Sequence, residues 1–229
     1  MKKAVVLLSG GLDSATALYA ASREGYQLTA LSFFYGQKHR RELDFARALA
    51  LGLGIQHFTG EVPMPWKGSA LLDASMAVPQ NRSHAEMGTG IPATYVPARN
   101  SVFLALAASC AEATGAGHIF IGANVLDYSG YPDCRPEYFR AFEEMLRKGT
   151  KAGAEGIALK IEAPLLQLTK KEIILLANRL GVPLEKTWSC YQGGAQPCGA
   201  CDSCLLRAKG FEEAGLSDPL INYAASPKR

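Results

Sequence analysis

Two groups of residues in this 229-residue chain have the types and spacing that chemistry needs. The first is a glycine-rich stretch, Ser9–Ser14 (SGGLDS), which follows the apolar residues 4–8 and precedes an alanine- and leucine-rich run. A buried strand that enters a helix through such a turn exposes backbone N–H groups, and the helix dipole adds roughly half a positive charge there. Gly10 and Gly11 permit positive φ and close approach of a phosphate. The stretch therefore predicts an anion-binding loop.

This loop differs from the two commonest nucleotide-binding motifs. It lacks the Gly-Lys-Ser/Thr ending of the P-loop and the Gly-x-Gly-x-x-Gly dinucleotide fingerprint. It resembles the pyrophosphate loop of the ATP pyrophosphatases, which split ATP between its α and β phosphates. The alternative interpretation is a glycine-rich turn that binds nothing.

The second group is a cluster of cysteines near the C-terminus. Its spacing is Cys-x7-Cys-x2-Cys-x2-Cys, formed by Cys190, Cys198, Cys201 and Cys204. Four thiolates in Cys-x-x-Cys pairs predict a tetrahedral, structural Zn²⁺ site, because four protein ligands leave no open position for catalysis. An iron–sulfur cluster is the alternative metal centre, and a disulfide framework does not suit a cytoplasmic protein.

Composition narrows the class of protein. The chain is 48% hydrophobic, with a formal net charge of +3 from 24 basic and 21 acidic side chains. This excess is too small to indicate a stable nucleic-acid partner, and no apolar run approaches the ~20 residues of a membrane span. We therefore expect a cytoplasmic protein without a membrane segment.

Alternating segments of strand and helix periodicity predict an α/β fold with a doubly wound, mostly parallel sheet of Rossmann type. The resemblance of the loop to that of the ATP pyrophosphatases implies a fold similar to the adenine nucleotide alpha hydrolases. We expect a nucleotide- and substrate-binding domain over 1–185 and a small zinc-binding segment over 186–229. The expected strands are 4–8, 27–34, 55–60, 118–122 and 157–163. The expected helices follow Ser14 and cover 40–53, 101–114, 136–151, 169–180 and 204–214.

Polar segments after these strands should meet at the carboxyl edge of the sheet. Residues 123–135 carry carboxylates, tyrosines and an arginine, and an ordinary polar loop and a binding loop remain equally open interpretations. Arg99 lies just before the predicted helix 101–114, at an N-terminus where a cation without an anionic partner is unfavourable. The proline-rich residues 62–92 predict a long loop, either a lid or a disordered segment, with a short helix at 69–75.

Taken together, the glycine-rich loop, the polar segments and the four cysteines resemble those of one family, the 7-cyano-7-deazaguanine synthases of queuosine biosynthesis. The resemblance covers nearly the whole chain. It rests on 9–14, 96–100 (VPARN), 127–135 (DYSGYPDCR), 164–172 and the four cysteines. It implies a homodimeric enzyme that uses ATP to adenylylate 7-carboxy-7-deazaguanine. Ammonia then forms an amide, and a second activation dehydrates that amide to the nitrile.

The resemblance also implies roles for individual residues. Asp13, Ser14, Arg99 and Lys170 would be catalytic: Arg99 and Lys170 stabilise phosphate charge, and Asp13 places Mg²⁺ or holds the loop. The ATP-binding residues would be Leu8, Ser9, Gly10, Gly11, Leu12, Asp13, Ser14, Ala15, Thr16, Ala17 and Leu18.

For the substrate, Asp133 would accept N–H bonds from the guanine-like edge, Tyr131 would stack, and Arg135 would hold the carboxylate. Cys134 is not expected to act as a nucleophile, since attack of an amine on an adenylate requires no thiol.

Two other functions fit parts of this pattern. A tRNA-modifying thiolase or a lysidine-type ligase also activates a base oxygen with ATP, but the small charge excess argues against it. A zinc-ribbon binding module fused to an inert α/β domain would turn over no ATP.

Overall fold

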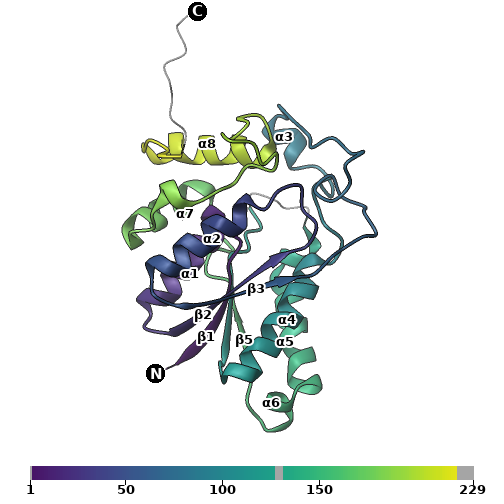
Figure 1. Cartoon of the computed structure of the whole chain (residues 1–229), viewed down its shortest axis with the longest axis vertical. Coiled ribbons are helices and arrows are strands. Elements are labelled where there is room, and N and C mark those ends of the chain that lie inside the picture. Colours follow the sequence, from purple (N-terminus) through teal and green to yellow (C-terminus); the bar gives the residue numbers. More distant parts are fainter. Residues whose placement is uncertain (1, 127–130, 221–229) are drawn as a thin grey trace, which may run out of the picture.

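A five-stranded parallel sheet lies between two layers of helices in the computed structural model, which describes residues 2–126 and 131–220 (Figure 1). The strand order is β3-β2-β1-β4-β5, and every neighbouring pair is parallel. The chain therefore reverses its winding direction next to β1, which places a crevice at the carboxyl ends of β1 and β4. The strands are β1 (Lys3–Leu7), β2 (Gln27–Phe34), β3 (Gln56–Glu61), β4 (His118–Ile121) and β5 (Lys160–Glu162).

Helices cover both faces of this sheet (Figure 1). On one face lie α1 (Leu12–Arg23), α2 (Arg41–Gly52) and α7 (Lys170–Leu180). On the other face lie α4 (Arg99–Thr114) and α5 (Pro136–Gly149). The remaining helical elements are α3 (His84–Met87), α6 (Lys151–Ala154), α8 (Asp202–Ala214) and the short 3-10 turns Pro132–Cys134 and Leu184–Lys186.

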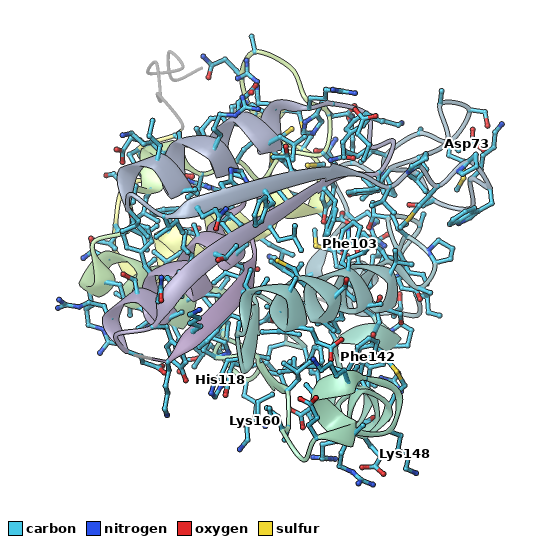
Figure 2. The ribbon with its side chains drawn as sticks, turned by 60° about the horizontal axis from the view of Figure 1, so that its bottom comes forward. Asp73, Phe103, His118, Phe142, Lys148 and Lys160 are labelled. Carbon is cyan, nitrogen blue, oxygen red and sulfur yellow. The ribbon has the colours of Figure 1, made fainter. Side chains whose placement is uncertain are left out.

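Alternation along β1 supplies two hydrophobic cores. Ala4 and Val6 pack with α1, α2 and α7, whereas Val5 and Leu7 pack with α4 and α5. All four side chains are buried, so β1 is the central strand and fixes the loop that follows it. Figure 2 shows Phe103 and Phe142 on the α4–α5 side, and His118 and Lys160 at the opposite edge of the sheet from that loop.

A third core joins the C-terminal segment to the long loop after β3. Trp188 is fully buried there, together with Cys190, Cys201 and the loop residue Met64. Gln80 forms an isolated antiparallel bridge with Cys201. The long loop is therefore packed against the cysteine segment over part of its length.

The structure confirms the predicted α/β class and the parallel sheet, and corrects some local predictions. Residues 69–75 form turns instead of the predicted helix, because Asp73 accepts hydrogen bonds from the backbone N–H and hydroxyl of Ser75 within a turn. The short helix of this loop is α3, where Ser83 and Glu86 form a capping box. The last strand is shorter than the predicted 157–163. The domain boundary after residue 185 stays a prediction.

Among the described residues, every helix is too short or too polar to cross a bilayer.

Candidate active site and cysteine cluster

The predicted anion-binding loop connects β1 to α1. The Ser9 and Ser14 hydroxyls lie 2.9 Å apart, and the Gly11 N–H donates to Ser9 Oγ at 3.2 Å. Gly10 has a φ of +88°, and a Cβ at this position would lie 2.1 Å from the backbone oxygen of Glu42. The loop therefore requires glycine at position 10, both for its left-handed backbone and for its contact with α2.

A charged pair closes one side of this loop. Lys170 Nζ, at the start of α7, lies 2.7 Å and 2.9 Å from the two carboxylate oxygens of Asp13. The Lys170 side chain is 12% exposed and that of Asp13 25%. Asp13 offsets the unfavourable interaction of the lysine with the α7 dipole, and the ammonium also faces the cavity described next.

A cavity of about 260 Å³ lies at the carboxyl edge of the sheet. It is bounded by the ends of β1, β2 and β4, by the starts of α1, α2, α4 and α7, and by residues 188–191. Leu8, Ser9, Gly11, Leu12, Asp13 and Ser14 of the predicted ATP-binding residues line it. Ala15, Ala17 and Leu18 lie instead in the hydrophobic core, and the Thr16 hydroxyl donates to the Leu12 carbonyl.

Arg99 reaches this cavity from the start of α4. Its Nη1 donates to the Tyr35 hydroxyl at 3.2 Å, and its guanidinium lies 5.6 Å from the centre of the Tyr35 ring. Ala98 before it has a φ of +52°, held by the bond from its N–H to the Tyr95 hydroxyl. Within residues 2–126 and 131–220, no carboxylate lies within ion-pair distance of Arg99. This arrangement suits an anionic ligand.

Glu42, which the sequence analysis missed, lines the same cavity from the first turn of α2. Burial raises the pKa of its carboxyl to about 7, although the nearby Arg99 lowers it. Tyr35, directly after β2, also lines the cavity, and burial raises the pKa of its phenol. In the sequence Glu42 looks like one of the charges on an amphipathic helix, so its pattern gave no signal of a site.

The predicted substrate residues have different positions. Tyr131 lines the cavity, and its hydroxyl lies 3.0 Å from Thr94 Oγ1. Asp133 is buried behind the cavity wall, where Oδ2 accepts from the Asn100 N–H at 3.2 Å and so caps α4. Arg135 is exposed at the start of α5 and does not line the cavity. Residues 127–130 of the same predicted stretch lie outside the described residues.

Cys134 also lines the cavity, and its chemistry can be judged from its surroundings. Burial, reinforced by the adjacent Asp133 carboxylate, raises the pKa of its thiol to about 12. Asn100 Nδ2 donates to its sulfur at 3.4 Å. A thiol that stays protonated at neutral pH is a poor nucleophile, in agreement with the expectation that Cys134 takes no covalent part.

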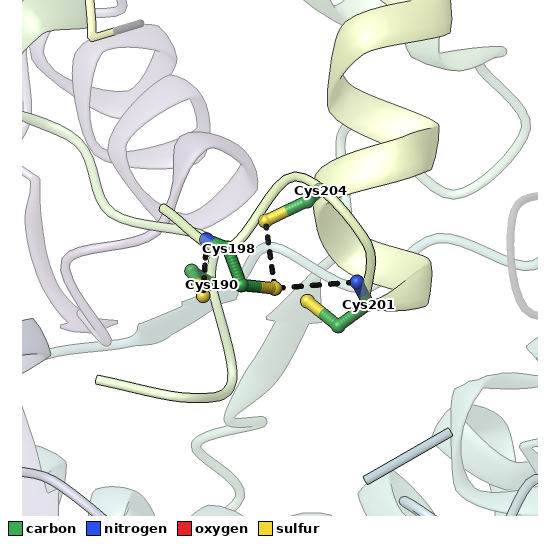
Figure 3. Close-up of side chains that lie close together, drawn as sticks. All are labelled: Cys190, Cys198, Cys201 and Cys204. Atoms are coloured by element: carbon green, nitrogen blue, oxygen red, sulfur yellow. Dashed lines mark hydrogen bonds between the residues drawn. The ribbon is translucent and has the colours of Figure 1, made fainter. Parts of the chain in front are cut away.

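The four cysteines converge at one point (Figure 3). Their Sγ atoms all lie within 4.8 Å of one another, and three of the four residues are buried. Zn–S bonds of about 2.3 Å in a tetrahedron place sulfurs roughly 3.8 Å apart, so the donor set fits such an ion. Backbone N–H groups of residues 198 and 201 donate to the sulfurs of Cys190 and Cys198 at 3.3 Å each, as expected for thiolate ligands.

The cysteine segment contacts the anion-binding loop directly. The backbone N–H of Trp188 donates to the Gly10 carbonyl at 2.9 Å. The His39 ring nitrogen Nε2 donates to the Cys190 carbonyl at 3.0 Å. Arg41, at the start of α2, stacks on the Trp188 ring and donates to the Ala195 carbonyl. The cysteine segment therefore helps to hold the backbone of the anion-binding loop in place.

Comparison with known proteins decides the family. A sequence model described as "Queuosine biosynthesis protein QueC" matches residues 3–215. The chain belongs to the QueC family. A relative named 7-cyano-7-deazaguanine synthase from Trichodesmium erythraeum is 53% identical over 221 residues, which cover 96% of this chain and all of the relative. A relative of the same name from Thermosynechococcus vestitus is 54% identical, and the match covers 99% of this chain and 97% of the relative. Another from Thermoplasma acidophilum is 53% identical, and the match covers 96% of this chain and 91% of the relative.

A solved structure of NMN synthetase from Francisella tularensis shares the fold. It aligns with a TM-score of 0.51 at 18% identity, covering 94% of this chain and 78% of that one. The shared fold agrees with the α/β architecture predicted from the alternating strands and helices.

Proposed function

We propose that this protein converts 7-carboxy-7-deazaguanine, ammonia and ATP into 7-cyano-7-deazaguanine. The observation that carries the proposal is the match of nearly the whole chain to relatives of that name. The geometry agrees, because one cavity joins an anion-binding loop to Arg99 and Tyr131. An acid that becomes a nitrile must be activated twice, so two molecules of ATP are consumed for each product.

The loop and two cations would bind the phosphates. The backbone N–H groups of residues 9–14 and the hydroxyls of Ser9 and Ser14 would hold the departing pyrophosphate. Lys170 and Arg99 would stabilise the negative charge that develops when the bond to the α phosphate breaks. Mg²⁺ would neutralise phosphate charge, with Asp13 as the loop carboxylate next to it.

The walls of the cavity would protect the acyl-adenylate until ammonia attacks it. An acyl-adenylate reacts with water, so a cavity with walls formed by Leu71 of the long loop and by residues 188–191 would favour attack by ammonia. Tyr131 would stack on the planar heterocycle, and its neighbour Tyr95 lies 5.7 Å from it, ring centre to ring centre. The roles of Asp133 and Arg135 toward the substrate remain proposals.

The four cysteines would hold a structural Zn²⁺. Four sulfur ligands complete its coordination, so the ion would stabilise the segment that contacts Gly10 and leave the chemistry to the cavity. We expect one zinc per chain by metal analysis, and loss of folding on chelation. An iron signal instead would favour the cluster alternative.

We also propose that the protein is a cytoplasmic homodimer that does not bind nucleic acid stably. The homodimer is testable by sedimentation of the purified protein. Salt-sensitive, tight binding of tRNA would contradict the last point and would revive the tRNA-modifying alternative.

Incubation of the protein with ATP, ammonium and 7-carboxy-7-deazaguanine, analysed by mass spectrometry, tests the function. We expect nitrile product with two AMP per molecule. Lys170→Met should reduce turnover by at least about 100-fold through lost charge stabilisation, whereas Lys171→Met, an exposed neighbour on the same helix, should not. AMP without nitrile would indicate a different acceptor, and no AMP would indicate a binding module.

A further inference from the structure

Glu42 places a carboxyl group at the cavity, within electrostatic reach of Arg99. The backbone oxygen of Glu42 packs against Gly10, so the main chain of this residue lies next to the loop. Glu42 also lines the cavity. Across the described ranges, 2–126 and 131–220, its carboxylate makes no hydrogen bond or ion pair. A carboxylate that lines a cavity without a protein donor is suited to a ligand that brings its own N–H groups.

The proposed reaction requires a group of this kind. When ammonia attacks the acyl-adenylate, the new C–N bond forms, the bond to AMP breaks, and the nitrogen must lose one proton to become an amide. If nitrogen arrives as ammonium, one more proton must leave before attack. In the second activation, the adenylylated amide loses AMP and its remaining N–H protons to become the nitrile.

On the basis of the proposed function, we infer that the Glu42 carboxylate accepts the protons that this nitrogen loses, and is therefore its general base. Each transfer converts the carboxylate to a carboxylic acid, which returns the proton to solvent before the next one. No oxidant, reductant or further reactant is needed.

Several other titratable groups on the cavity are already engaged. Both oxygens of Asp13 accept from Lys170, and Cys134 is a protonated thiol. The Tyr35 hydroxyl accepts from Arg99. Among the described residues of the cavity, Glu42 is therefore the carboxylate without a protein partner. His39 Nδ1 also has no hydrogen-bond partner there, but the same ring donates from Nε2 to the Cys190 carbonyl and belongs to the packing of the cysteine segment.

The charged surroundings of Glu42 suit a base. Arg99 faces it from α4, Tyr35 from the end of β2, and Cys190 from the cysteine segment, while Lys38 and His39 line the same cavity. Burial brings the pKa of its carboxyl close to the pH at which a general base is most effective. Arg99 keeps the ionised form accessible while it binds the anionic acyl-adenylate.

The test separates proton transfer from activation. In Glu42→Gln, exchange of labelled pyrophosphate into ATP, dependent on the carboxylic acid substrate, should stay within about threefold of the wild-type rate. Turnover with ammonium should fall by roughly 100-fold to 10,000-fold, the range for a lost general base. Hydroxylamine is largely unprotonated at neutral pH, and trapping of the adenylate as the hydroxamate should therefore fall less than about tenfold.

Glu61→Gln is the matched control, because the Glu61 side chain is 69% exposed and pairs with Arg40 on the surface. It should leave all three activities unchanged. Retained exchange in Glu42→Gln proves a folded site; if exchange is lost, Glu42→Asp is measured in the same way. Unchanged ammonium turnover, or parallel losses with ammonium and hydroxylamine in a variant that keeps exchange, would overturn the inference. Lack of nitrile from the wild-type protein would instead overturn the proposed function.

Discussion

Gly10→Ala should destabilise the protein and disable the loop. Gly10 has a φ of +88°, and the added Cβ would lie 2.1 Å from the Glu42 oxygen and 2.8 Å from the Ala46 nitrogen. Both atoms belong to the backbone of α2, so no side-chain rotation relieves the contact. An ordinary contact begins at 3.4 Å, so the loop and α2 must separate by roughly 1.3 Å. That movement would also strain the bond from the Trp188 N–H to the Gly10 carbonyl.

Gly25→Ala isolates the part of this cost that comes from the backbone angle. Gly25 has a φ of +79°, and an added Cβ would meet nothing within 4 Å. Its substitution should cost about 1–2 kcal/mol, the price of a left-handed residue with a side chain. Gly10→Ala adds an overpacking term of about 1–3 kcal/mol, for a total of about 2–5 kcal/mol.

Urea denaturation of both variants measures the difference. In thermal melts, Gly25→Ala should lower the midpoint by about 2–8 °C and Gly10→Ala by about 4–20 °C, at about 2–4 °C per kcal/mol for a domain of this size. ATP binding should be lost only in Gly10→Ala, because only that residue belongs to the loop. Equal destabilisation by the two substitutions, with ATP binding intact in both, would refute the packing argument.

Two further predictions concern a buried ion pair and a half-buried histidine. Asp218 is paired with Arg207 at 2.6 Å and 2.8 Å, and the two side chains are at most 3% exposed. Asp218→Ala should therefore cost about 3–5 kcal/mol in urea denaturation by leaving a buried guanidinium unpaired, whereas Glu213→Ala, which breaks an exposed pair with Lys209, should cost under about 1 kcal/mol. If Asp218→Ala lowered the free energy of unfolding by less than about 1 kcal/mol, the result would contradict a stabilising role of the buried pair. Burial lowers the pKa of His57, so the unfolded chain binds a proton more readily, and stability should fall as pH drops below about 6.5. His57→Gln should flatten that pH dependence in melting experiments, and an unchanged slope would exclude this histidine as its source.

Much of the architecture follows from local pattern. The apolar run of β1, the glycines after it and the periodicity of α4, α5 and α7 predicted a parallel α/β fold, which the structure and the shared fold confirm. The clearest failure was in the long loop, where Asp73 and Ser75 form a turn in place of a predicted helix. Side-chain hydrogen bonds to nearby backbone compete with helix formation there, and periodicity does not record them.

The site was only partly accessible to sequence reasoning. Asp13, Lys170 and Arg99 were predicted and do meet at one cavity, although their catalytic roles stay predictions. Glu42 carried no signal, because a carboxylate on an amphipathic helix normally faces solvent. Asp133, singled out for the substrate, caps α4 from behind the cavity wall.

By itself, the sequence determined which local groups exist: a glycine-rich loop after an apolar strand, four cysteines at metal-binding spacing, and an alternation of strands and helices. Each of these features is defined by residues that lie close together in the chain, so the sequence alone reveals it. Only the tertiary structure decided which groups share a cavity, because the positions of Glu42, Arg99 and Trp188 depend on how α2, α4 and the cysteine segment pack against the end of β1. Burial, and with it the pKa of Glu42, is a property of that packing.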